Sequence, residues 1–166
     1  MSFTIRPARA EDADRMGVVI VQSWHETYAH LLPAETLASL DPAERADMWR
    51  RAIERRGGVG GPVVAEVDGV VVGLAGAGTP LDEDPPVPLQ LYVIYLLAAH
   101  HGSGAGQGLL DAAIGTEPAL VWVAEDNPRA IAFYERNGFV RDGTSDELSI
   151  GDGSIHEIRM VRGATA

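Results

Sequence analysis

Residues 101–110 read His-Gly-Ser-Gly-Ala-Gly-Gln-Gly-Leu-Leu and directly follow the nearly apolar run 89–97. The run predicts a central strand buried on both faces, and residues 106–114 predict a helix. Glycine at every second position from 102 to 108 leaves backbone N–H groups unshielded, and the following helix begins there with its positive dipole end. A turn of this kind between a strand and a helix indicates a cradle for a phosphate or pyrophosphate.

Two other phosphate-binding motifs fit this turn less well. The P-loop ends in Gly-Lys-Ser/Thr, whereas Gly106-Gln107-Gly108 has neither the lysine nor the hydroxyl. The dinucleotide fingerprint lies in the first strand-to-helix turn, with an acid about 20 residues later. Glu125 meets that spacing, but the turn comes late in the chain, after a predicted hairpin. A tight turn that only needs glycine geometry remains the structural alternative.

Helix and strand signals alternate along the rest of the chain. Residues 12–28 carry apolar side chains at helical spacing, and Asp41, Pro42 and Glu44 predict the capped start of a second helix that Gly57-Gly58 ends. Asp68-Gly69 between two β-rich runs predicts a hairpin. Further signals predict a first strand at 3–6, a loop at 79–88, strands at 119–123, 139–150 and 155–162, and a helix at 128–137. This order predicts a mixed α/β fold, in one domain over residues 1–166.

The second informative stretch is 121–139, Val-Trp-Val-Ala-Glu-Asp-Asn-Pro-Arg-Ala-Ile-Ala-Phe-Tyr-Glu-Arg-Asn-Gly-Phe. Asp126 or Asn127 can cap the helix that Pro128 opens. A strand, a glycine-rich turn, a helix, a strand and then Asn-x-x-Ala-x-x-x-Tyr-x-x-x-Gly-Phe resembles the GNAT superfamily of N-acetyltransferases. The matching positions are Asn127, Ala130, Tyr134, Gly138 and Phe139. The resemblance extends over nearly the whole chain and implies a sheet of six or seven strands flanked by about four helices.

The resemblance also implies acetyl-coenzyme A (acetyl-CoA) as cosubstrate, no metal, and a role for each matched position. Leu96 and Leu97 would pair with the pantetheine arm, and the amide of one of them could polarise the thioester carbonyl. Tyr134 would be the general acid near the thioester sulfur, and Trp24 and Tyr28 would line the acceptor site. The implied cofactor-binding set is Leu96, Leu97, His101, Gly102, Ser103, Gly104, Ala105, Gly106, Gln107, Asn127 and Tyr134, in which the amides from Gly102 to Gln107 would hold the pyrophosphate.

Structural roles remain the alternatives for four of these residues. His101 is a solvated loop residue and Trp24 a core residue in that interpretation. Asn127 is an N-cap if it does not contact the pantetheine or the acetyl end, and Tyr134 is a packed helix residue if its hydroxyl is satisfied.

Three residues depart from the family pattern. His101 stands where glutamine or arginine is usual, and Ala98 stands where proline is common. Gln90 stands where many relatives carry a glutamate near the acceptor, and glutamine cannot take a proton. The general base is therefore open between a water chain and the side chains of His25, Glu26, His30 and Glu66.

Composition limits the possible partners. The net charge of −11 disfavours nucleic acid and favours an amine acceptor. Cysteine is absent, which excludes a cysteine nucleophile, and no apolar run approaches the roughly 18 residues of a membrane span. The start of the chain lacks the pattern of a secretory signal, so we expect a cytoplasmic protein without membrane partners; a homodimer is open.

The expected activity is direct transfer of acetyl from acetyl-CoA to a primary amine of a small molecule or peptide. The alternatives are a coenzyme A-binding regulatory or interaction module with weak catalysis and a nucleotide-binding protein that uses the same turn.

Overall fold

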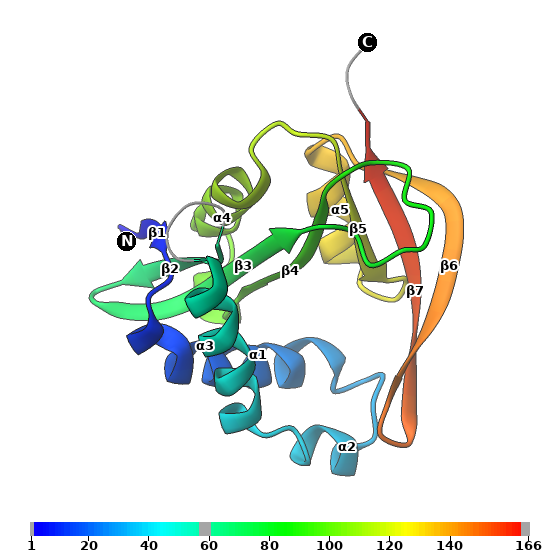
Figure 1. The fold of residues 1–166 in the computed structure, drawn as a ribbon. Helices are drawn as coiled ribbons and strands as arrows, with labels where there is room; N and C mark the ends of the chain where they lie inside the picture. Colours follow the sequence, from blue (N-terminus) through cyan, green and yellow to red (C-terminus); the bar gives the residue numbers. More distant parts are fainter. Residues whose placement is uncertain (1, 57–60, 164–166) are drawn as a thin grey trace.

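A computed structural model describes residues 2–56 and 61–163. Seven strands of the described chain form one mixed sheet in the order β1-β2-β3-β4-β5-β7-β6 (Figure 1). The strands are β1 (Thr4–Pro7), β2 (Val63–Val67), β3 (Val70–Gly78), β4 (Gln90–Leu96), β5 (Ala119–Ala124), β6 (Val140–Ile150) and β7 (Gly153–Arg162). The predicted α/β fold class is confirmed.

Helices cover both faces of this sheet (Figure 1). They are α1 (Ala13–Tyr28), α2 (Ala34–Ala38), α3 (Pro42–Arg56), α4 (Ala105–Ile114) and α5 (Pro128–Arg136), with short 3-10 turns at Ala10–Asp12 and Ala98–His100. A Cβ at Gly73 of β3 would meet Leu109 of α4, whereas one at Gly76 would meet Trp49 of α3, so the two helices lie on opposite faces. None of the helices in the described ranges is long and apolar enough to cross a bilayer.

Several local predictions are confirmed by backbone geometry. Asp68 and Gly69 have φ angles of 50° and 79°, as a two-residue hairpin turn requires. The Oδ1 of Asp41 accepts the amide of Ala43 at 2.9 Å at the start of α3. No described residue hydrogen-bonds the side chain of Glu44, so the second half of that capping box is not made. The predicted helix end at Gly57-Gly58 lies outside the described residues.

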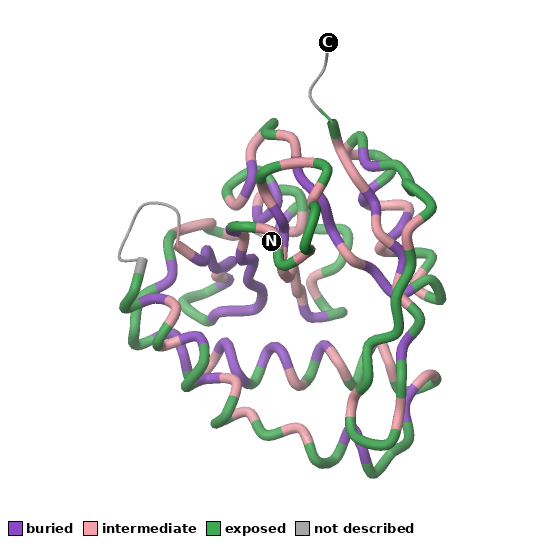
Figure 2. Tube along the Cα trace, turned by 45° about the vertical axis from the view of Figure 1, so that its right-hand side comes forward, coloured by how far each residue is buried: buried purple, intermediate pink, exposed green. Residues whose placement is uncertain are grey.

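The prediction that β4 is buried on both faces is wrong for most of its length. Only Gln90 and Leu91 are buried, and the following residues of the strand are half-buried. The reason is the neighbouring strand: β4 pairs with β5 only at Gln90–Leu120 and Leu91–Val121, after which the strands diverge. The burial trace shows the same pattern, with buried segments in the inner strands and an exposed β6 at the sheet edge (Figure 2). The end of β4 therefore has free backbone positions on its β5 side.

A buried carboxylate connects β1 with the start of α1. The Oδ2 of Asp12 accepts Arg6 Nη1 at 2.8 Å and the Arg9 amide at 2.7 Å, and Arg6 Nη2 also reaches Glu66 at 2.7 Å. The hydrogen bonds from Arg6 lower the pKa of Asp12 below its ordinary value. Because the pKa of Asp12 is lowered in the folded state, its ionised form stabilises the fold at neutral pH. This stabilisation is lost as the pH falls through the folded-state pKa of Asp12.

We expect Asp12→Ala to lower the free energy of unfolding by about 2–3 kcal/mol at neutral pH, because Arg6 and the Arg9 amide lose a buried charged acceptor. Urea denaturation measures the change. Asp14→Ala is the matched control, because Asp14 is an exposed carboxylate that pairs with Arg50 at 2.8 Å and should cost less than about 1 kcal/mol. Equal losses in the two variants, or a difference that persists in acid, would contradict the assignment.

Candidate active site

The glycine turn between β4 and α4 presents unpaired backbone donors. Gly102 and Gly104 have φ angles of 80° and 91°, a region that glycine adopts without strain. The amides of Gly102, Gly104, Gly106 and Gln107 donate to no acceptor among the described residues. A Cβ added at Gly102 would meet nothing within 4 Å, so the turn opens to solvent. Four free N–H groups at a helix start fit two adjacent phosphates.

The other residues of the turn keep it in this shape. The amide of Ser103 donates to the His100 carbonyl at 3.3 Å, and the Ser103 hydroxyl accepts the Ala105 amide at 3.2 Å. His101 Nε2 lies 2.8 Å from the Leu96 carbonyl, to which it donates. The imidazole thus ties the turn to the end of β4, at the position where the family pattern has glutamine or arginine.

The two leucine amides at the end of β4 differ in availability. The Leu97 amide donates to the Val72 carbonyl at 3.0 Å and is therefore engaged inside the sheet. Successive amides of an antiparallel strand point to opposite edges, so the Leu96 amide faces the gap that β5 leaves open. Of the two donors that the sequence left open, only Leu96 offers its N–H toward that gap.

Tyr134 lies on α5 with its ring fixed and its hydroxyl unpaired. Its ring contacts Phe133 and Phe139 edge to face, with centroid distances of 5.5 and 5.6 Å. The side chain is 6% exposed, and the hydroxyl forms no hydrogen bond with the described residues. Burial raises the pKa of Tyr134, and the hydroxyls of Tyr28 and Tyr95 raise it further. The phenol therefore stays protonated and can donate a proton.

Asn127 is the N-cap of α5, as one of its two predicted roles requires. Its Oδ1 accepts the Ala130 amide at 3.2 Å. Its Nδ2 has no partner among the described residues and remains available to a ligand.

Aromatic side chains from α1 and β4 contact one another. Trp24 Nε1 donates to the Tyr95 hydroxyl at 2.8 Å, and the rings of Trp24 and Tyr28 contact each other at a centroid distance of 4.8 Å. Burial raises the pKa of both Tyr28 and Tyr95. The predicted acceptor-site residues Trp24 and Tyr28 thus contact each other, and Trp24 is hydrogen-bonded to Tyr95 on the part of β4 that diverges from β5.

The carboxylates that the sequence suggested as general bases have other partners. Glu66 pairs with Arg6 at 2.7 Å, and Glu26 Oε2 accepts the Ala98 amide at 2.9 Å. Gln90, which replaces the family glutamate, is buried and accepts the Leu81 amide at 2.9 Å. Gln90 therefore holds the loop between β3 and β4.

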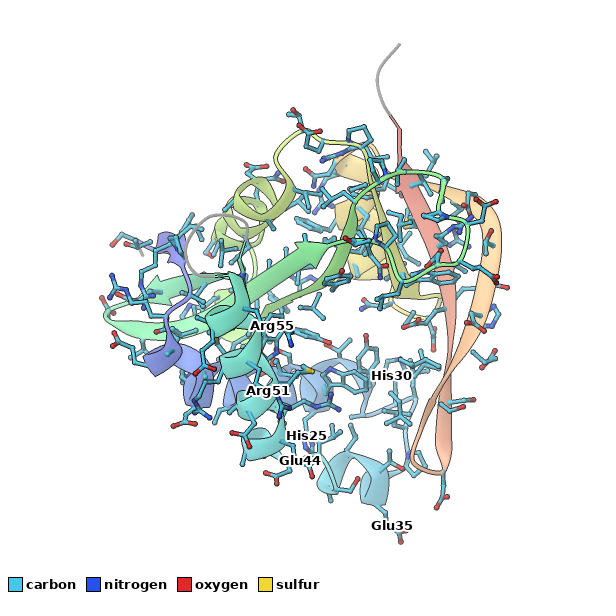
Figure 3. The ribbon with its side chains drawn as sticks, viewed as in Figure 1. His25, His30, Glu35, Glu44, Arg51 and Arg55 are labelled. Carbon is cyan, nitrogen blue, oxygen red and sulfur yellow. The ribbon has the colours of Figure 1, made fainter. Side chains whose placement is uncertain are left out.

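The two histidine candidates are exposed, and Figure 3 shows them on α1 and just beyond it. His30 lies 3.4 Å from the exposed carboxylate of Asp126. The described residues contain no group of three or more histidine and acidic side chains placed to hold a metal ion.

Sequence reasoning missed Glu157 on β7. Glu157 is half-buried and lies opposite Ala124, the last residue of β5. Trp24 and Tyr28 pack against the buried cluster of Ala124 and Ile155, and Ala124 is the strand partner of Glu157. The charge of Glu157 adds to the burial that raises the pKa of Tyr28 and Tyr95. The available signal was an acid two residues after the buried Ile155, and therefore on the same face of the strand.

Comparisons with known proteins agree with this geometry. A model of the acetyltransferase (GNAT) family matches residues 22–139. YuaI of Bacillus subtilis (strain 168), an uncharacterized N-acetyltransferase, is 35% identical over 139 residues, which are 80% of this chain and 77% of that protein. A mycothiol acetyltransferase of Geodermatophilus obscurus is 35% identical over 68 residues, 37% of this chain and 22% of that protein.

Two solved structures share the fold. PaiA N-acetyltransferase of Thermoplasma acidophilum, in complex with coenzyme A, has a TM-score of 0.75 at 20% identity, with 99% of this chain and 100% of that chain covered. The Salmonella typhimurium protein yncA, with its cofactor acetyl-CoA, has a TM-score of 0.68 at 20% identity, with coverage of 100% and 96%. The family model spans most of the chain, and YuaI is similar over four fifths of it. The chain belongs to the GNAT family of acetyltransferases.

Proposed function

We propose that this chain transfers the acetyl group of acetyl-CoA to a primary amine of a small molecule or peptide, by direct attack of the amine. The observation that carries the proposal is a turn with four free amides that is joined to α5, the helix that bears the unpaired, protonated phenol of Tyr134. Gln107 of the turn donates to Asn137 at the end of α5 at 2.8 Å. Family membership supports acetyl transfer, and the complexes of PaiA and yncA support acetyl-CoA as donor.

Each part of the site has a task in this reaction. The four free amides of the turn, those of Gly102, Gly104, Gly106 and Gln107, bind the two phosphates. The Leu96 amide donates to the thioester carbonyl oxygen, where charge develops. Bound acetyl-CoA supplies the acetyl group as a thioester. Tyr134 donates its phenolic proton to the sulfur as the thiol leaves. Trp24 and Tyr28 exclude water from the acceptor side.

Calorimetric titration with acetyl-CoA, ATP and NAD tests donor binding. We expect micromolar binding of acetyl-CoA alone, because the turn lacks the P-loop lysine and the topology of a dinucleotide site. Thiol release against alkyl amines, diamines, amino acids and a lysine peptide then tests transfer. Binding without turnover on that panel would favour a coenzyme A-binding module, and binding of ATP or NAD in place of acetyl-CoA would contradict the proposal.

A further inference from the structure

Glu157 is a half-buried carboxylate without a partner. It lies on β7 opposite Ala124, the last residue of β5, three residues beyond the last β4–β5 pair at Leu91–Val121. No described residue forms a hydrogen bond or ion pair with its side chain. The two carboxylates that the sequence suggested as bases differ in this respect, because Glu26 and Glu66 are engaged elsewhere. A carboxylate that is withdrawn from water and left unpaired is costly to the fold, which indicates a functional reason for it.

The groups that face Glu157 come from every element around the gap. Its charge adds to the burial that raises the pKa of Tyr28 on α1 and of Tyr95 on β4. The charge of Asp146 on β6 repels the Glu157 carboxylate. The charge of Arg45 on α3 lowers the pKa of Tyr95, and Arg45 forms no ion pair among the described residues. Figure 1 shows the carboxyl end of α1, where Tyr28 lies, turned toward β7.

The same two phenols connect Glu157 with the proposed general acid. In addition to burial, Tyr28 and Tyr95 raise the pKa of Tyr134. The charge of Glu157 likewise raises the pKa of Tyr28 and Tyr95. Tyr28 also packs against the buried cluster that contains Ala124, the strand partner of Glu157. Trp24 contacts Tyr28 and donates to the Tyr95 hydroxyl. An amine on the acceptor side, next to Tyr28, would therefore have the Glu157 carboxylate as its proton acceptor.

We propose that Glu157 is the catalytic residue that binds the acceptor as its ammonium ion and takes the proton that must leave before attack. This inference rests on the proposed function and names the base for the same site. The ammonium gives one proton to the Glu157 carboxylate, and the freed nitrogen lone pair attacks the thioester carbonyl carbon. The C–N bond forms and the C–S bond breaks while the sulfur takes the Tyr134 proton. The nitrogen loses its second proton through solvent, which reprotonates Tyr134, and Glu157 releases its proton to solvent.

The environment of Glu157 suits a base. Burial, and secondarily the charge of Asp146, raise its pKa above the ordinary value. A carboxyl group with a raised pKa accepts a proton more readily than a solvated one, which lowers the energetic gap to an alkylammonium donor. The value of kcat/KM should rise with pH as Glu157 ionises. A variant without the carboxylate should not show this rise on the acid side of the pH profile.

The test compares two nucleophiles in Glu157→Gln, Glu157→Asp and the wild type. With n-butylamine, which is protonated at neutral pH, we expect Glu157→Gln to lower kcat/KM by about 10²- to 10³-fold. Hydroxylamine is largely unprotonated at neutral pH and needs no base, so its loss should stay below about tenfold. Alkaline pH should bring the butylamine rate of Glu157→Gln back toward the wild type, and Glu157→Asp should recover part of the activity.

Glu135→Gln is the matched control, because Glu135 is an exposed carboxylate on α5 with no side-chain partner among the described residues. It should keep wild-type rates with both nucleophiles, and all variants should bind acetyl-CoA equally by calorimetry. An unchanged butylamine rate in Glu157→Gln would overturn the inference, as would an equal loss with both nucleophiles, since that marks a structural role. If the wild type releases no thiol with either nucleophile or with any amine of the wider panel, the proposed function itself is wrong.

Discussion

Tyr134→Phe should lower kcat by about 10²- to 10⁴-fold and leave the Kd for acetyl-CoA within about twofold. The substitution removes only a hydroxyl that has no hydrogen-bond partner in the described structure. The ring contacts with Phe133 and Phe139 are available to phenylalanine as well, so packing should be unchanged. The loss would therefore belong to the proton that the leaving thiol no longer receives. Stopped assays of thiol release measure kcat, and calorimetric titration measures the Kd for acetyl-CoA.

Tyr92→Phe is the control for removing a phenolic hydroxyl near the same strand. Tyr92 lies on β4, and its hydroxyl donates to the Thr79 carbonyl at the surface. We expect its kcat to stay near the wild-type value. If Tyr134→Phe keeps its turnover, Tyr134 serves only to pack against Phe133 and Phe139. If both variants lose activity to the same extent, the effect is a general response of β4 and its surroundings.

Local features of the fold could be predicted because neighbouring residues determine them. Asp68-Gly69 requires positive φ angles that few other residues adopt, and Asn127-Pro128 combines a capping side chain with a residue that suits the first turn of a helix. The helix α2 escaped prediction because the five residues Ala34–Ala38 are too few to show a period.

Features that depend on pairing between distant strands could not be predicted. The burial of β4 depends on where β5 leaves it, and nothing in an apolar run encodes that divergence. Which of Leu96 and Leu97 has a free amide depends on the register with β3, since a shift of one residue would exchange them. Glu157 joins the site only because β7 inserts between β5 and β6 and faces the end of α1. The candidates that belong to sequence motifs could thus be proposed from the sequence, whereas the unpaired acid could not.

Gly104→Val should weaken acetyl-CoA binding by about 10- to 100-fold, which corresponds to roughly 1.4–2.8 kcal/mol. Gly104 is the residue before α4, with φ of 91°, and its amide is one of the four free donors of the turn. A branched side chain there shields those donors and disfavours the backbone angle that directs them to one point. Calorimetric titration of acetyl-CoA measures the loss.

Gly69→Val is the control that distinguishes a loss of phosphate binding from a loss of stability by backbone strain. Gly69 has a similar φ of 79° in the β2–β3 hairpin, and a Cβ there meets nothing within 4 Å. Valine at either position should cost of order 1–3 kcal/mol of stability, because both force a left-handed conformation on a branched residue. Thermal denaturation should thus show comparable losses, while only Gly104→Val loses affinity for acetyl-CoA. Equal affinity in both variants would mean that the free amides after β4 do not bind the phosphates, and the turn would then be only a connection between β4 and α4.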